Sequence, residues 1–259
     1  MLCTVSNMAL NVITEVNARL SKATEQRLGL PAEGDIWLSF EAQSGELIRT
    51  LPDGAVVLDL GGGRRCIYAG EVDPPGRLKL IAVDISPDEL ASNTDVAETL
   101  VADVAKHIPA PDASGDLILS RALLEHVDDV PAAIREMARV LRPGGTALHF
   151  VPCRFSIFGI GARLLPFDLL LRLTMKLAPW FREEAFGFKI YYDHCYPSAL
   201  ERAFRDAGFT DVRTEISWSC DAYFTGVYPL YVLHALYEQI VRRLRIRRLA
   251  AYVIIRAVR

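Results

Sequence analysis

The chain has 259 residues, 51% of them apolar and 24% charged, which is typical of a globular protein and excludes a disordered, collagenous or disulfide-knot chain. The net charge of −3 divides unevenly: residues 1–150 carry 13 Lys and Arg against 22 Asp and Glu, whereas residues 151–259 carry 16 against 10. Five scattered cysteines, never in a CxxC spacing, favour a reducing compartment over a disulfide framework, and we predict no metal site.

Strands and helices alternate after a helical N-terminal segment. Residues 5–50 are expected to be helical, with a break near 28–34. Helices are then predicted to begin at the capping box Ser86-Pro87-Asp88-Glu89, to run from Asp129 to Arg142, and to cover 198–207. Strands are predicted over 55–60, 79–84, 99–103, 116–120, 146–151, 211–218 and 249–258. This alternation predicts an α/β fold: a doubly wound, seven-stranded, mostly parallel sheet covered by helices on both faces.

Two apolar segments interrupt the alternation, at 154–194 and 221–248. Each follows a predicted parallel strand, so each should leave the sheet at its carboxyl edge, where open α/β sheets bind ligands. We expect them to form a helical cap over a substrate site. The predicted division is an N-terminal helical segment (1–50), a cofactor-binding core (51–153), a cap insertion (154–195), a core helix and strand (196–220), a second cap insertion (221–248) and a closing strand (249–259).

A glycine-rich turn, Gly61-Gly62-Gly63, follows the buried strand Val56–Leu60, as in proteins that bring a ligand close to the backbone. The dinucleotide pattern GxGxxG would need glycine at position 66, where Cys66 stands. Asp59 would also repel a pyrophosphate and attract a cationic ligand. These two features make a nicotinamide-dependent oxidoreductase, the protein class that the GxGxxG pattern would indicate, a weak interpretation of this sequence.

Three further polar positions follow predicted strands. Asp84 can accept hydrogen bonds from both hydroxyls of a ribose, since Ser86 and Glu89 already account for helix capping. Asp103 can accept an amino hydrogen of adenine or can be a simple loop acid. His126, in the run SRALLEHV after the fourth strand, is by itself better explained as a residue that satisfies local backbone groups.

The motifs VVLDLGGG, AVD, VAD, SRALLEHV and LRPGG, in this order and spacing, resemble those of class I S-adenosylmethionine-dependent methyltransferases, in particular the small-molecule, type 11-like group. The resemblance covers about residues 50–152, with a weaker echo at 208–212. It implies the Rossmann-like methyltransferase fold and S-adenosyl-L-methionine as the cofactor. One departure is that the family's third glycine position falls on Arg65.

The resemblance also implies roles for single residues. The glycine turn and Asp59 would hold the methionine portion, Asp84 the ribose, Asp103 and Val104 the adenine, and Ser120 and Arg121 would line the pocket beneath the sulfonium. The implied cofactor-binding residues are Asp59, Gly61, Gly62, Gly63, Asp84, Ile85, Asp103, Val104, Ser120 and Arg121. His126 and His194 are the candidate catalytic bases, although a packing role in the cap explains His194 equally well.

The expected reaction is in-line methyl transfer, most readily to an oxygen of a small or a lipid- or glycan-linked acceptor. The alternative is a non-catalytic S-adenosylmethionine-binding regulator or scaffold. We predict no signal peptide over residues 1–20 and no membrane-spanning helix, because no uncharged apolar run of about 18 residues occurs, and we therefore expect a cytoplasmic location.

The apolar cap residues and the arginines of 242–248 leave two interpretations open. They form either a peripheral contact with an anionic membrane through 154–182 and 229–248, or a cap core with solvated arginines. Nucleic acid is not an expected partner, because the arginines lack an aromatic stacking platform. The apolar cap residues in question are Phe155, Phe158, Leu164, Leu165, Leu169, Leu170 and Leu171.

Overall fold

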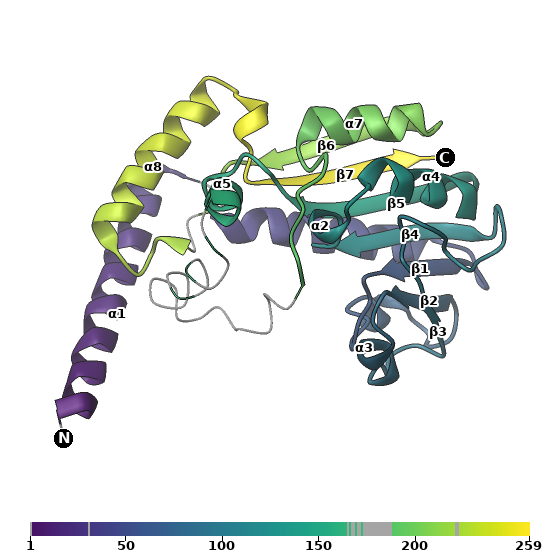
Figure 1. The fold of residues 1–259 in the computed structure, drawn as a ribbon, viewed down its shortest axis with the longest axis horizontal. Coiled ribbons are helices and arrows are strands. Elements are labelled where there is room, and N and C mark those ends of the chain that lie inside the picture. Colours follow the sequence, from purple (N-terminus) through teal and green to yellow (C-terminus); the bar gives the residue numbers. More distant parts are fainter. Residues whose placement is uncertain are drawn as a thin grey trace.

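A seven-stranded sheet lies between two layers of helices in the computed structural model, which describes residues 2–30, 32–164, 166, 169, 172, 188–220 and 223–259 (Figure 1). The strands are β1 (Val56–Leu60), β2 (Lys79–Asp84), β3 (Glu98–Val101), β4 (Gly115–Arg121), β5 (Leu141–Pro152), β6 (Thr210–Ser217) and β7 (Tyr252–Val258). The helices are α1 (Leu2–Leu28), α2 (Glu33–Thr50), α3 (Pro87–Ala91), α4 (Val130–Val140), α5 (Ile157–Leu164), α7 (Pro197–Asp206) and α8 (Tyr228–Arg243).

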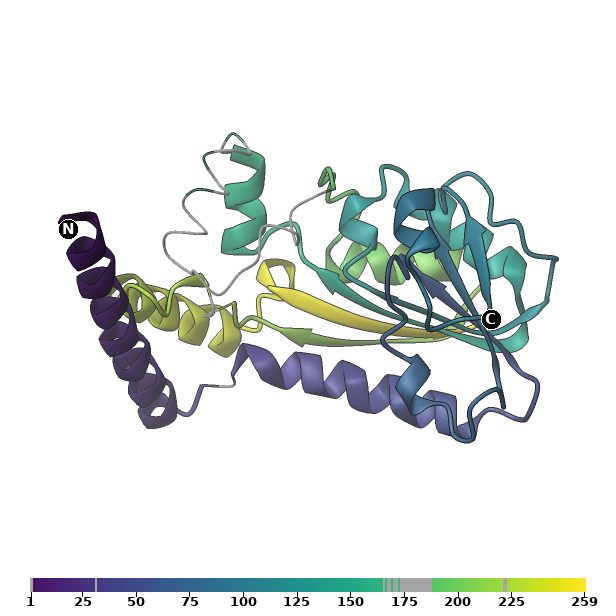
Figure 2. The ribbon, with the colours of Figure 1, turned by 90° about the horizontal axis from the view of Figure 1, so that it is seen from below.

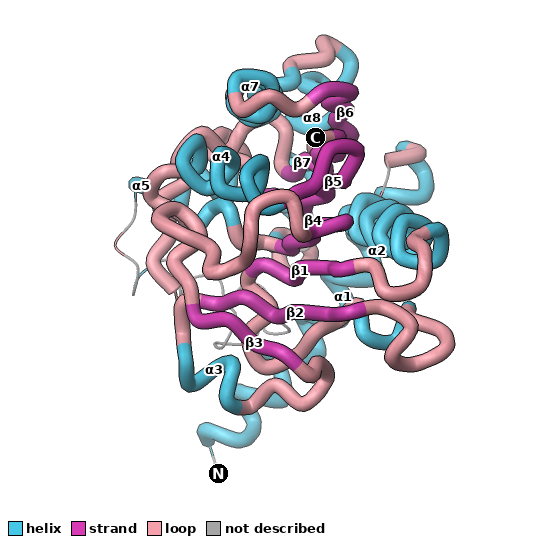
Figure 3. The backbone as a smooth tube through the Cα atoms, turned by 90° about the vertical axis from the view of Figure 1, so that its right-hand side faces the viewer, coloured by secondary structure: helices cyan, strands magenta, loops and turns pink. Residues whose placement is uncertain are grey.

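The strand order is β3-β2-β1-β4-β5-β7-β6, and the predicted mostly parallel sheet is confirmed. Only β7 runs antiparallel to its neighbours, β5 and β6, among the strands that the structure describes. The central strand β1 pairs in parallel with β2 on one side and with β4 on the other, so the chain order reverses beside β1 (Figure 3). Such a reversal leaves a crevice at the carboxyl ends of the strands, which is where doubly wound sheets bind ligands.

Both faces of the sheet are buried at its centre, which explains why β1 and β7 are nearly continuous apolar runs. Successive residues of β4 point to opposite faces: Leu117 and Leu119 pack with α2, while Ile118 packs with α4 and α7. Figure 2 shows α2 along one face and α4 and α7 along the other. This alternation decides on which side of the sheet each polar residue near a strand end must lie.

Several boundaries differ from the predicted ones. The third strand ends at Val101, so Asp103 lies in the following loop. The helix expected to reach Arg142 ends at Val140, and β5 begins at Leu141, which is buried and pairs with Gly115 across a register shift. The capping box is only half formed: the Ser86 hydroxyl accepts from the Glu89 backbone, but the Glu89 carboxylate binds Arg64 instead.

The two insertions leave the sheet at its carboxyl edge, as expected, because α5 follows β5 and α8 follows β6. The structure adds a third member to this region: α1, from the other end of the chain, lies along α8 (Figures 1 and 2). The Asn17 amide donates to the Gly226 carbonyl at 2.9 Å, and the hydroxyls of Thr24 and Tyr228 are 3.0 Å apart. Of the predicted apolar cap residues, Leu165, Leu170 and Leu171 lie outside the described residues, as does 173–182 within the predicted membrane segment.

The short 3-10 turn Leu124–His126 ties the end of the first insertion to the core. The backbone carbonyl of Glu125 accepts hydrogen bonds from the backbone N–H groups of Tyr191 and Tyr192, at 2.8 and 3.0 Å. The Glu125 carboxyl group is buried, and its Oε2 has no hydrogen-bond partner in the described part of the chain. Burial raises the pKa of Glu125 to about 8, so the carboxyl group is largely protonated at neutral pH.

The glycine turn gives a first test of this packing. A Cβ added at Gly62 would lie 2.9 Å from the Ala82 Cβ and 3.1 Å from the Asp59 carbonyl oxygen, whereas one added at Gly70 would meet nothing within 4 Å. We expect Gly62→Ala to lower the free energy of unfolding by about 1–3 kcal/mol through overpacking. Gly70→Ala is the matched control and should change it by much less. Urea denaturation measures both, and equal effects would contradict the close packing.

The buried Glu125 gives a test in pH. Its folded-state pKa of about 8 lies above the ordinary value of 4.5 for a glutamate. The protonated carboxyl group therefore favours the folded state below pH 4.5, and this contribution is lost as the pH rises toward 8. A glutamine cannot titrate. We therefore expect the free energy of unfolding of the wild type, measured relative to Glu125→Gln, to fall by roughly 3 kcal/mol between pH 5 and pH 8. The exposed Glu41→Gln is the control, and a difference independent of pH would refute the assignment.

Candidate active site

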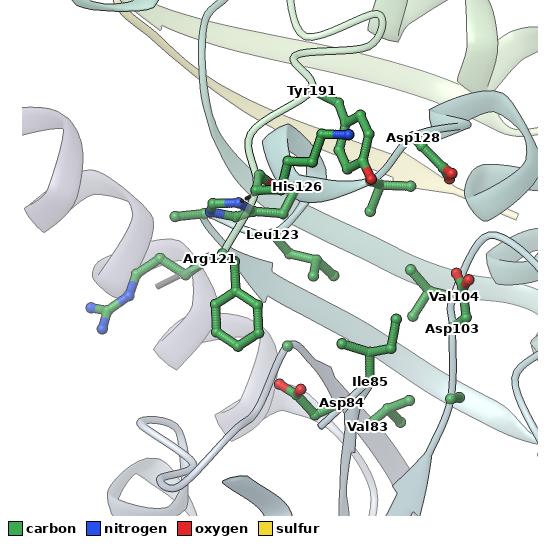
Figure 4. A pocket seen from close by; sticks show the side chains of 16 residues that line it. Val83, Asp84, Ile85, Asp103, Val104, Arg121, Leu123, His126, Asp128 and Tyr191 are labelled. Carbon is green, nitrogen blue, oxygen red and sulfur yellow. Dashed lines mark hydrogen bonds between the residues drawn. The ribbon is translucent and has the colours of Figure 1, made fainter. Parts of the chain in front are cut away.

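A cavity of about 420 Å³ opens at the carboxyl edge, where β1, β2 and β4 end (Figure 4). Its volume lies within the range of small-molecule binding sites. The predicted site residues that line it are Gly61, Asp84, Ile85, Asp103, Val104, Arg121 and His126. The structure therefore brings together residues that are up to 65 positions apart in the sequence, because parallel neighbouring strands end at the same edge.

The glycine turn is held against the end of β2. The backbone N–H groups of Gly61 and Gly62 donate to the Val83 carbonyl oxygen at 2.7 and 3.3 Å. Gly61 has a φ of +74°, and a Cβ there would lie 3.2 Å from Leu123, which also lines the cavity. Only glycine adopts this conformation readily in so narrow a space, so bare backbone is presented to the cavity at Gly61.

Asp84 is fixed by the backbone around it. Its Oδ2 accepts a hydrogen bond from the Gly63 N–H at 3.1 Å, and its Oδ1 accepts one from the Ser86 N–H at 2.9 Å. Each carboxylate oxygen can accept a further bond. The carboxylate thus lines the cavity in a set orientation, with capacity for two donors such as adjacent hydroxyl groups.

Asp59 lies behind the turn, in the core between the sheet and α2, and does not line the cavity. A Cβ at Gly62 would be 3.1 Å from its Oδ2. Burial raises the pKa of Asp59 to about 7, against the lowering effects of a hydrogen bond with Cys66 and of the charge of Arg121. An anion in this position is stabilised by a nearby cation.

Asp103 and Val104 line the cavity from the loop after β3, the strand next to β2. The Asp103 Oδ1 accepts from the Ala105 N–H at 3.1 Å, and its Oδ2 lies 2.8 Å from the Lys106 ammonium. The hydrogen bond from Lys106 is the main reason that the pKa of Asp103 is lowered. The side chain therefore remains an anionic acceptor at the cavity wall.

Ser120 and Arg121 are adjacent at the end of β4 but point to opposite faces of the sheet. Arg121 lines the cavity, and its guanidinium lies 5.6 Å from the ring centroid of Trp37 on α2. Ser120 does not line the cavity: it is fully buried, and its hydroxyl shares a hydrogen bond of 2.7 Å with Nδ1 of His149 on β5. The expectation that both residues line the pocket is therefore corrected for Ser120.

His126 lies at the side of the cavity formed by residues 188–191. Its Nδ1 is 3.0 Å from the Lys189 carbonyl oxygen, and a carbonyl can only accept, so Nδ1 carries the hydrogen. Burial lowers the pKa of His126 below its ordinary value of 6.5, which favours the neutral ring. The Nε2 lone pair is therefore available to accept a proton, because Oε1 of the Glu125 carboxyl group is 3.8 Å away, beyond hydrogen-bond distance.

His194 lies elsewhere. It lines a separate hollow together with Arg135 of α4 and Arg202 of α7, and its Nδ1 is 2.8 Å from the Asp193 carboxylate. That carboxylate also accepts from the Val130 N–H at the start of α4. The structure thus separates the two histidines that were predicted as bases, and only His126 shares a cavity with the predicted cofactor residues.

The end of the first insertion, which was expected to cap the site, contributes three lining residues that the sequence did not single out. Phe188, Lys189 and Tyr191 line the cavity, and the Lys189 ammonium lies 4.4 Å from the centre of the Tyr191 ring. The aromatic composition of this segment is a signal in the sequence, but its contact with His126 depends on the fold. By contrast, no described residue of 223–248 lines the cavity. Nor does any group of three or more His, Cys, Asp or Glu side chains among the described residues have the arrangement of a metal site.

Comparison with solved structures finds the same fold in distant proteins. The phosphoethanolamine N-methyltransferase 2 of Haemonchus contortus, solved with S-adenosylhomocysteine, aligns over 86% of this chain and 52% of its own, with a TM-score of 0.53 and 16% identity. The [4+2]-cyclase SpnF aligns over 84% of this chain and 80% of its own, with a TM-score of 0.54 and 18% identity. At these identities the likeness shows the fold alone.

Comparison of sequences identifies the family. A family model described as a methyltransferase domain matches residues 17–214. A malonyl-[acyl-carrier protein] O-methyltransferase of Yersinia pestis is 36% identical over 42% of this chain and 40% of its own length, so the chain spans less than half of that relative. A demethylmenaquinone methyltransferase of Mycolicibacterium gilvum is 32% identical over 61% of this chain and 69% of its own. The chain therefore belongs to the methyltransferase-domain family, and its sheet has the Rossmann-like fold of class I methyltransferases.

Proposed function

We propose that the cavity at the carboxyl edge binds S-adenosyl-L-methionine, with the ribose hydroxyls on Asp84 and the adenine between Ile85 and the Asp103–Val104 loop. The observation that carries this proposal is the Asp84 carboxylate, oriented by two backbone N–H groups and still able to accept two hydrogen bonds. Asp103 is an anionic acceptor for an amino group, and Ile85 supplies an exposed apolar surface for a flat ring.

The methionine portion of the cofactor fits the other end of the cavity. Bare backbone at Gly61 permits close approach, and Arg121 also lines the cavity. The buried Asp59 behind the turn, whose pKa is raised to about 7, would be stabilised as an anion by the ligand's ammonium group. The cofactor, when bound, supplies an electrophilic methyl group on sulfur.

The proposed reaction is methyl transfer to an oxygen of a small or a lipid- or glycan-linked acceptor. The chain's task is to align the acceptor and to exclude water, and Phe188 and Tyr191 supply an apolar wall for this purpose. The Nε2 atom of His126, held as an acceptor by the Nδ1 bond to Lys189, would take the hydroxyl proton. The names of the relatives, a malonyl-[acyl-carrier protein] O-methyltransferase and a demethylmenaquinone methyltransferase, support an acyl- or lipid-linked acceptor without choosing between them.

The ribose assignment is tested by cofactor binding. Asp84→Ala should weaken the affinity for S-adenosylmethionine by roughly 100-fold, because two hydrogen bonds to a charged group are lost. Asp88→Ala, which alters an exposed carboxylate four residues away, is the matched control. Isothermal titration calorimetry measures both affinities, with circular dichroism to establish folding. A folded Asp84→Ala variant that binds as tightly as the wild type would exclude the ribose role.

The base is tested by the dependence of rate on pH. Activity is measured as release of S-adenosylhomocysteine from S-adenosylmethionine with a lipid fraction as the acceptor source. For the wild type, kcat/KM should rise through a pKa below 6.5 and stay level above it, because the base must be deprotonated. His126→Gln should lower the rate on the order of 100-fold and remove the rising limb.

The exposed His107→Gln is the control for that experiment, and His194→Gln tests the other predicted base. If His194→Gln lowers the rate and His126→Gln does not, His194 and not His126 is the base. The same assay decides between an enzyme and the alternative of a non-catalytic regulator or scaffold. If the protein binds the cofactor but forms no S-adenosylhomocysteine when the lipid fraction is added, the regulator is favoured.

A further inference from the structure

The helix α8 presents an apolar stripe to solvent. The stripe residues are spaced by three or four positions, so they lie on one side of the helix. Its opposite side is buried, with Tyr231, Ala235 and Val241 packed in the protein. The exposed stripe consists of Leu230, Leu233, Leu236, Ile240 and Leu244, with exposed fractions from 40% to 65%. Isolated exposed leucines need no explanation, but a stripe of five along one helix is typical of an interaction surface.

The neighbouring helix α1 also carries exposed apolar residues. Ile13, Val16 and Leu20 are exposed at spacings of three and four, next to the side on which Asn17 and Thr24 contact α8 and the turn before it. The two helices lie side by side at the end of the molecule toward which the carboxyl edge of the sheet points (Figures 1 and 2). Both helices of this pair thus expose apolar side chains, and we call the surface formed by the exposed apolar residues of α1 and α8 the α1–α8 face.

Three arginines gather where these helices end. Arg242, Arg243 and Arg245 line a hollow of about 590 Å³. Its other wall includes Leu28, the last residue of α1, and the two residues that follow it, Gly29 and Leu30. Within the described residues, no carboxylate forms an ion pair with any of the three arginines. This distinguishes them from the next two in the sequence.

Those next two arginines are already engaged by the protein. Arg247 forms an ion pair with Glu201, and the Arg248 guanidinium lies 4.5 Å from the ring centre of Phe155. The arginines of 242–248 are therefore not one solvated cluster: two stabilise the fold and three remain exposed beside apolar residues. In a chain whose net charge is −3, this is a local excess of positive charge.

We propose that the α1–α8 face binds peripherally to the surface of an anionic lipid bilayer, with the α8 stripe among the acyl chains and Arg242, Arg243 and Arg245 on lipid phosphates. Apolar residues beside exposed arginines match the boundary between acyl chains and anionic headgroups. A second copy of the chain fits less well, because a symmetric contact through this face would bring two sets of arginines together.

Among the helices that the structure describes, none could span a bilayer. The contact that we propose is one of surface binding. It extends the proposed function without depending on it. A bilayer bound here would lie at the same edge of the sheet as the cavity, which would suit an acceptor that resides in a membrane.

The test is co-sedimentation of the full chain, without cofactor or acceptor, with vesicles of phosphatidylcholine alone or with added phosphatidylglycerol. We expect binding to the anionic vesicles, little binding to the neutral ones, and weakening by added salt. Arg243→Gln combined with Arg245→Gln should reduce partitioning by roughly 25-fold, about fivefold for each charge. Arg202→Gln, an exposed arginine on α7, is the matched control.

A second pair of variants tests the apolar stripe. Leu233 on α8 and Leu38 on α2 are both 64% exposed. Leu233→Ser should reduce partitioning by about tenfold, and Leu38→Ser should leave it unchanged. Failure of the wild type to bind anionic vesicles, equal effects of both leucine variants, or a dimer in light scattering that Leu233→Ser dissociates would each overturn the proposal. Because no methyl transfer is measured, these outcomes leave the proposed reaction to its own test.

Discussion

The hydrogen bonds between the glycine turn and the end of β2 are the constraint on which the site depends. Three consecutive backbone N–H groups, those of Gly61, Gly62 and Gly63, bond to Val83 and Asp84, so the turn after β1 and the loop after β2 behave as one piece. The same bonds orient the Asp84 carboxylate toward the cavity. Because β1 and β2 are buried on both faces, neither can shift to relieve a change in the turn, and the cavity keeps its shape.

The side of the cavity formed by residues 188–191 is connected to the sheet less directly than the glycine turn is. Residues 188–191 belong to an insertion, yet they are held to the core through Glu125 and His126, which follow β4. The backbone of Glu125 fixes Tyr191 and Tyr192, and the ring of His126 bonds to Lys189. The proposed base and the proposed acceptor wall are thus parts of one local structure, so a movement of the insertion would change the environment of His126 as well.

The two cap insertions differ in what they contribute. The first reaches the cavity, whereas the described part of the second packs against α1 and meets the first through the stacked rings of Phe158 and Tyr223, 4.3 Å apart. The second insertion therefore contacts both α1 and the helix α5 of the first insertion. If the α1–α8 face binds a bilayer, as we propose, these contacts help to set the position of the cavity relative to the membrane surface.

The sheet, the glycine turn, and the placement of Asp84 and Asp103 after strands follow from local sequence patterns. A buried strand followed by glycine or an acidic residue is such a pattern, and any parallel sheet brings the ends of its strands to one edge. The other features of the site depend on tertiary contacts. Side-chain direction along β4 turns Ser120 inward to His149 while Arg121 faces the cavity. Packing between residues far apart in sequence separates His194 from His126 and pairs α1 with α8. Local periodicity carries no information about such contacts, since it fixes a residue's own helix or strand and not the partner that this element meets.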